Sequence, residues 1–126
     1  MNRQGQSLKQ WLQRLMRRHV FAMDVHPTAW IAETALIDRT WPRGIHIGAG
    51  CVIGEEAVIL THDLTRGLYV DTRVGEGTFI GARAIILPGI SIGRNCVVQP
   101  GALVNRDMPD DHEAMGNPAT ITPRAA

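Results

Sequence analysis

The chain has 126 residues, of which 13 are basic and 12 acidic, so its formal net charge is only +1. With 44% hydrophobic residues, this composition predicts one folded domain rather than a disordered chain. A charge balance this close to neutral gives no support for nucleic-acid binding. No apolar run approaches the ~18 residues that cross a bilayer, and there is no signal-peptide pattern, so we expect a cytoplasmic protein.

Residues 1–24 are expected to form an amphipathic helix and a short linker. Ser7 and Gln10 have the spacing of a capping box. Apolar side chains follow at helical spacing, opposite a basic face, and comprise Leu8, Trp11, Leu12, Leu15, Met16, His19 and Val20. Such a helix can lie on a membrane surface. We favour packing of the apolar stripe over the end or flank of the following segment, or against another subunit, because stacked repeats need an apolar cap.

A six-residue repeat dominates the chain from residue 25 onward. Twelve hexads each begin with Val or Ile, and these leaders are Val25, Ile31, Ile37, Ile47, Ile53, Ile59, Val74, Ile80, Ile86, Ile92, Val98 and Val104. Gly follows the leader in five hexads, and in eight hexads a small residue, most often Ala, stands four positions after it. This period is typical of a parallel β-helix, in which each hexad is one short strand and one turn.

Three hexads make one three-sided coil, so the repeat predicts about four stacked coils over residues 25–109. Leaders of successive coils should then lie over one another in aliphatic columns, with the plus-four residues pointing into the same core. Cys51 and Cys96 stand at plus four. We therefore interpret both as small core residues rather than as a disulfide or a catalytic pair.

The repeat is interrupted twice. Ten residues separate Ile37 from Ile47, and fifteen separate Ile59 from Val74. The second interruption predicts a polar loop at residues 60–73, and loops carried on a rigid scaffold often hold functional residues. Residues 110–126 follow the repeat as a C-terminal tail.

Two parts of the chain resemble a known family. The run from Phe79 through Ile-Leu-Pro-Gly at 86–89 to Pro109, with Gly-Asn-Pro-Ala at 116–119, is similar to the C-terminal half of hexapeptide-repeat acetyltransferases, particularly sugar and xenobiotic O-acetyltransferases. Ile-Leu-Thr-His-Asp at 59–63 resembles the loop that carries that family's catalytic histidine. The resemblance implies an all-β, left-handed parallel β-helix, an exception to the usual right-handed crossover. It also implies a homotrimer with active sites between subunits, and acetyl-coenzyme A as cosubstrate without a metal.

The resemblance assigns roles to individual residues. His62 matches the general base, whose neutral imidazole takes the proton of a sugar, glycan or similar hydroxyl as that oxygen attacks the thioester. The positions that match cofactor contacts are Ala82, Pro100, Asn105 and Arg106; Pro100 lacks the N–H usual at its position, and Arg106 could hold a nucleotide phosphate. Phe79 stands where relatives often carry Trp beside the acceptor. Independently of the resemblance, Asp63, Tyr69 and Asp71 are expected near the acceptor because they lie in the same loop as His62, and Asp63 could instead orient the imidazole.

Other functions of a β-helix make different demands on the sequence. A γ-class carbonic anhydrase needs converging metal-binding histidines with a His-x-x-x-x-His pair, which the five histidines of this chain do not provide. An ice-binding face would require a regular column of Thr, which is absent. A noncatalytic β-solenoid scaffold stays open as an alternative, since the chain is short and carries only Arg124 as a basic residue after Gly-Asn-Pro-Ala.

Overall fold

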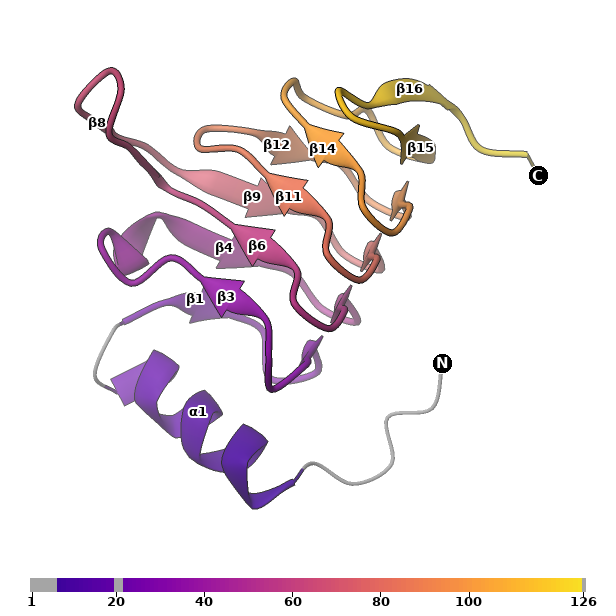
Figure 1. Ribbon diagram of the computed structural model, residues 1–126. Coiled ribbons are helices and arrows are strands. Elements are labelled where there is room, and N and C mark those ends of the chain that lie inside the picture. The colour runs from indigo at the N-terminus through magenta and orange to yellow at the C-terminus, as the bar shows by residue number, and fades with distance from the viewer. Residues whose placement is uncertain (1–6, 20–21, 126) are drawn as a thin grey trace.

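The computed structural model describes residues 7–19 and 22–125 and shows a mostly β chain with one N-terminal helix (Figure 1), as predicted. The regular elements are α1 Leu8–His19, β1 Asp24–Val25, β2 Trp30–Ile31, β3 Leu36–Ile37, η1 Pro42–Gly44, β4 Ile45–Ile47, β5 Val52–Ile53, β6 Val58–Ile59, β7 His62–Asp63, β8 Leu68–Tyr69, β9 Thr72–Val74, β10 Phe79–Ile80, β11 Ile85–Ile86, β12 Ser91–Ile92, β13 Val97–Val98, β14 Leu103–Val104, β15 His112–Met115 and β16 Thr120–Pro123. No helix in the described part of the chain is long and apolar enough to cross a membrane.

Most strands fall into three sheets, which the chain visits in rotation. Sheet A has the order β1-β4-β9-β12, sheet B the order β16-β15-β13-β10-β5-β2, and sheet C the order β14-β11-β6-β3. Neighbours within each sheet are parallel, except for the antiparallel pair β15 and β16. Each passage through sheets A, B and C therefore forms one layer, and the layers lie one above another (Figure 1).

The register places the hexad leaders opposite one another. In sheet B, Ile31 pairs with Ile53, Ile53 with Ile80, and Ile80 with Val98. The leaders of sheets A and C pair in the same way. Nearly all of these side chains are buried, several completely. The predicted aliphatic columns are confirmed, and they form the core because every leader points inward.

The plus-four residues complete this core. Cys51 and Cys96 are both fully buried, in line with Ala57, Ala84 and Ala102, and their thiols contact backbone carbonyls, at 3.0 Å from Cys51 Sγ to Gly75 O and 3.1 Å from Cys96 Sγ to Pro109 O. Burial raises the pKa of the Cys96 thiol, which keeps it protonated and unreactive. The interpretation of both cysteines as core residues is confirmed.

Both interruptions of the repeat lie at the corner where the chain passes from sheet C to sheet A. The first contains η1, whose Gly44 is buried; a Cβ there would lie 2.6 Å from Trp41 Cδ1 and from Val70 O. The second contains the antiparallel pair β7 and β8, in which His62 lies opposite Tyr69 and Asp63 opposite Leu68. The predicted loop is thus a short hairpin.

Helix α1 lies beyond the first layer of strands (Figure 1). Its capping box is confirmed, since Gln10 N donates to Ser7 Oγ at 3.1 Å and Ser7 N donates to Gln10 Oε1 at 3.0 Å. The prediction that the apolar stripe of α1 packs on the repeat of the same chain is wrong. Gln10 is buried there instead, whereas Leu8 and Trp11 of the stripe are exposed. Polar side chains can hydrogen-bond the open edge of the strands, which apolar ones cannot. Val20 of the predicted stripe lies outside the described residues.

The C-terminal tail contains the last two strands. Strand β15 pairs in parallel with β13, and Ala114 lies opposite the leader Val98. Ala114 is fully buried, so it continues the inward column by one more layer. The Gly-Asn-Pro-Ala segment forms the turn between β15 and β16.

Candidate functional site

His62 begins the hairpin β7–β8, and a buried carboxylate holds its backbone in place. Asp38 is only 7% exposed, and its Oδ2 accepts hydrogen bonds from Thr61 N at 3.0 Å and His62 N at 3.1 Å. Its Oδ1 accepts a third from Thr40 N at 2.8 Å. The Asp38 side chain therefore accepts hydrogen bonds from one backbone N–H of the first interruption and two of the second. These bonds fix the position at which the hairpin begins.

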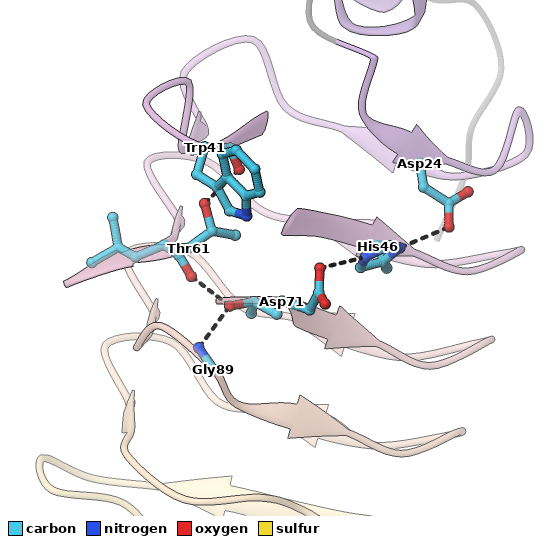
Figure 2. A network of polar contacts seen from close by, with 8 residues as sticks. Asp24, Trp41, His46, Thr61, Asp71 and Gly89 are labelled. Carbon is cyan, nitrogen blue, oxygen red and sulfur yellow. Dashed lines mark hydrogen bonds and ion pairs between the residues drawn. The ribbon is translucent and has the colours of Figure 1, made fainter. Parts of the chain in front are cut away.

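Two buried threonines add further bonds at the same corner (Figure 2). Thr61 Oγ1 donates to Trp41 O at 2.7 Å, and Thr72 Oγ1 donates to Leu60 O at 2.6 Å. Thr72 Oγ1 also accepts a hydrogen bond from Gly89 N at 2.9 Å, so it connects two layers. Both ends of the hairpin are consequently fixed to the core.

The imidazole of His62 stacks on an aromatic neighbour. Its ring centroid lies 4.9 Å from that of Tyr69, with an interplanar angle of 11°. Tyr69 in turn lies 5.7 Å from Trp41 at an angle of 55°. The His62 side chain is partly buried, and among the described residues its ring nitrogens have no hydrogen-bond partner. Stacking orients the ring and leaves both nitrogens available to a ligand.

An open cavity of about 1040 Å³ lies beside His62. Its lining comes from both interruptions and from the next layers, and includes Asp38, Arg39, His62, Asp63, Pro88 and Asn105. The cavity thus joins the expected catalytic residue His62 with Asn105, one of the expected cofactor contacts. Its size suits a small molecule or one end of a longer one.

Asp63 is engaged within the hairpin rather than by His62. Arg66 Nε donates to Asp63 Oδ2 at 2.7 Å, and Arg66 N donates to Asp63 Oδ1 at 3.1 Å. The side-chain hydrogen bond from Arg66 is the largest of the effects that lower the pKa of the Asp63 carboxyl. Asp63 is an ionised group at the rim of the cavity, held by a neighbouring arginine.

Asp71 is brought together with a histidine that the sequence analysis did not single out. His46 Nε2 lies 3.0 Å from Asp71 Oδ1, and His46 Nδ1 lies 2.9 Å from Asp24 Oδ2 (Figure 2). Asp24 on β1 lies opposite His46 on β4, and Asp71 immediately precedes β9, the next strand of sheet A. Asp71 is therefore engaged away from His62, and its expected role near the acceptor stays a prediction.

The remaining expected residues lie elsewhere on the repeat. Ala82 and Pro100 are exposed at the corner between sheets B and C, in adjacent layers, and Phe79 lies partly buried on sheet B. Within the described residues, Ala82 N makes no intrachain hydrogen bond, while its carbonyl accepts one from Gly101 N at 2.9 Å. Ala82 thus offers a free backbone donor. A single chain does not bring these three residues to His62.

Asp38, Arg39 and Trp41 were missed by the sequence analysis. One signal was available for Asp38: it stands directly after the leader Ile37, a position that holds Gly in five other hexads. A carboxylate there, at the start of an interruption, indicates unpaired backbone donors nearby. For Arg39 and Trp41 the sequence offers no comparable signal.

The outward residues of sheets B and C form apolar surfaces. These are the residues immediately before the leaders, because strand side chains alternate between faces. On sheet C they are Leu36, Val58, Ile85 and Leu103, and on sheet B they include Trp30, Val52, Phe79 and Val97. The same column on sheet A is polar, with Asp24, His46, Arg73 and Ser91. Two faces of the repeat thus carry the surface expected of a protein contact.

The described part of the chain contains no group of three or more His, Cys, Asp or Glu side chains arranged to hold a metal ion.

Residues 71–106 match the family described as bacterial transferase hexapeptide (six repeats). Serine acetyltransferase 2 of Arabidopsis thaliana is 39% identical over 113 residues, which cover 81% of this chain and 32% of that protein. YvoF of Bacillus subtilis, described as an acetyltransferase, is 35% identical over 116 residues, which cover 90% of this chain and 65% of that protein. The chain therefore spans less than two thirds of both relatives. The resemblance to hexapeptide-repeat acetyltransferases predicted from the sequence is confirmed.

Solved structures share the fold. The hexapeptide-repeat acetyltransferase VCA0836 from Vibrio cholerae has a TM-score of 0.70 at 21% identity, covering 94% of this chain and 82% of that one. A second structure of that protein is complexed with acetyl coenzyme A. A maltose O-acetyltransferase from Clostridium difficile 630 has a TM-score of 0.62 at 23% identity, covering 98% of this chain and 80% of that one. At these identities the likeness shows a common fold.

Proposed function

We propose, from the membership of residues 71–106 in the bacterial transferase hexapeptide family, that this chain is an acetyl-coenzyme-A-dependent O-acetyltransferase acting on a sugar, glycan or similar hydroxyl. His62 is the general base. The observation that carries the proposal is the oriented imidazole of His62, whose backbone is held by Asp38 and whose free nitrogens lie beside an open cavity. The sugar acceptor draws support from the maltose O-acetyltransferase that shares the fold.

In the proposed reaction, neutral His62 accepts the proton of the acceptor hydroxyl as that oxygen attacks the thioester carbon. The carbon–sulfur bond then breaks, and the proton held by the imidazole passes to the departing coenzyme A sulfur. The products are an acetyl ester and free coenzyme A. Backbone N–H groups of the turns can stabilise the negative charge on the carbonyl oxygen. No covalent bond to the protein is needed.

We further propose that the repeat winds left-handed in about four coils and assembles as a homotrimer. The apolar outer faces of sheets B and C support this assembly, because the face of sheet C on one chain can pack against sheet B of the next around a threefold axis. His62 lies at one edge of sheet C, and Ala82 and Pro100 lie at the other. Neighbouring chains can then supply the base and the cofactor contacts to one site. Asn105 and Arg106 would complete the contacts with coenzyme A.

The test is a screen of candidate glycans and nucleotide sugars that reads the release of free thiol from acetyl coenzyme A. With an accepted acceptor, His62→Ala should lower turnover by roughly 10² to 10⁴, the usual contribution of one general base. Assembly and coenzyme A binding should be unchanged, because His62 lies outside the core.

Near-normal turnover of the His62→Ala variant would remove His62 from the mechanism. If the chain bound neither acetyl coenzyme A nor any acceptor, that result would instead favour the noncatalytic scaffold function. A stable monomer in sedimentation at micromolar concentration would contradict the proposed trimer.

A further inference from the structure

Helix α1 is attached to the repeat through polar groups. Gln10 Nε2 donates to Ile31 O at 2.9 Å, and Gln13 Nε2 donates to Glu33 O at 3.2 Å. Both carbonyls belong to the first layer of strands or the turn that follows it. Gln10 is buried in this contact. Residues three apart share one face of a helix, so the face of α1 that meets the repeat is polar.

The opposite face of α1 is apolar and exposed. Its exposed fractions are 73% for Leu8, 50% for Trp11, 48% for Leu12, 36% for Leu15 and 46% for Met16. Because Gln10 faces the strands, this stripe is directed away from them, at the N-terminal end of the stack (Figure 1). A continuous row of five large apolar side chains on a surface indicates a docking site.

The charges of α1 indicate what docks there. The helix contains Lys9, Arg14, Arg17 and Arg18 and no acidic residue. Lys9 and Arg14 are exposed, while burial lowers the pKa of the Arg17 guanidinium. Two copies of α1 packed face to face would bring cations together without a carboxylate on either helix, which is unfavourable. Basic residues beside an apolar stripe complement the anionic headgroups and the apolar interior of a lipid surface.

We propose that α1 docks the protein end-on to an anionic membrane surface. The stripe enters the headgroup region, while the exposed cations contact lipid phosphates. A single such helix lies in the interface and does not cross the bilayer. The cavity beside His62 lies along the side of the stack, with lining residues from Leu36 in the first layer to Asn105 in the last, and it stays accessible in this orientation. This inference is independent of the proposed acetyl transfer.

The experiment is co-sedimentation of the full chain with vesicles of phosphatidylcholine alone or with about a third of phosphatidylglycerol. We expect binding to the anionic vesicles that weakens with added salt. Trp11→Gln combined with Leu15→Gln should reduce the affinity by roughly tenfold for each side chain, because each loses its apolar burial. Lys9→Gln combined with Arg14→Gln should remove the preference for anionic lipid. Met115→Gln, at an exposed apolar residue on β15 far from α1 in the stack, is the control and should change nothing.

Three results would overturn the proposal: no binding of the unmodified chain to anionic vesicles, unchanged binding of the stripe variant, or a change of oligomeric state in that variant by sedimentation velocity. The last result would assign the stripe to a contact between copies of the chain. Circular dichroism checks that each variant is folded. Leu8→Gln, at the most exposed position of the stripe, repeats the vesicle test if the double variant does not fold.

Discussion

Replacing the buried carboxylate of Asp38 tests how the site is built. Asp38→Ala removes the acceptor of three backbone N–H groups, from Thr40, Thr61 and His62. Thr40 is exposed and can turn to water, whereas Thr61 is fully buried and His62 is partly buried. Two donors are thus left without a partner inside the protein.

The cost follows from those two donors. A buried donor that loses its acceptor costs about 1–3 kcal/mol, so the variant should lose roughly 2–6 kcal/mol of folding free energy. For a domain of this size, at about 4 °C per kcal/mol, that loss lowers Tm by roughly 8–24 °C. Asp38→Asn keeps one acceptor oxygen and should lose less.

The assay is thermal unfolding by circular dichroism at one fixed protein concentration, since assembly makes Tm depend on concentration. Asp107→Ala is the matched control, because Asp107 Oδ1 accepts one backbone hydrogen bond, from Ser91 N at 2.8 Å, at an exposed position. It should cost under ~1 kcal/mol. Equal Tm values for Asp38→Ala and the unmodified chain would refute the anchoring role of Asp38.

Two further variants test the charged groups. Arg106→Ala should raise KM for acetyl coenzyme A with little change in kcat, because a remote phosphate contact acts equally in the ground and transition states. Steady-state kinetics at saturating acceptor measures both constants. A collapse of kcat at constant KM would contradict the placement of Arg106 at the phosphate. Arg66→Gln should raise the pKa of Asp63 toward the ordinary carboxyl value, as followed by NMR titration, since Arg66 holds that pKa low. The Asp63 interaction therefore stabilises the fold above the unfolded carboxyl pKa and is lost as the pH falls through the lowered value. An unchanged titration would show that Arg66 does not hold the carboxylate in solution.

The six-residue period alone predicted the three-sheet core. Each leader is β-branched, and eight of the twelve plus-four residues are Ala, Cys or Thr, so position in the hexad determines which side chains point inward. That is why the pairing of Ile31, Ile53 and Ile80, and the burial of Cys51 and Cys96, followed from the sequence. The position of His62 in an interruption was also readable, because fifteen residues cannot form two six-residue sides.

The tertiary structure decided the partners of the polar groups. Asp38 and His62 are 24 residues apart, and only the stacking of two interruptions at one corner brings them into contact. The pairing of Asp71 with His46, 25 residues earlier, depends in the same way on which residues adjacent layers bring together.

The sequence likewise could not predict which face of α1 contacts the repeat. Helical periodicity identifies an apolar stripe but not what the stripe meets. The open edge of the first layer presents the carbonyls of Ile31 and Glu33, which are satisfied by Gln10 and Gln13. Because these hydrogen bonds hold the polar face inward, the apolar face points out. Sequence periodicity thus determined which residues share a face, and the unpaired backbone groups of the fold determined where each face points.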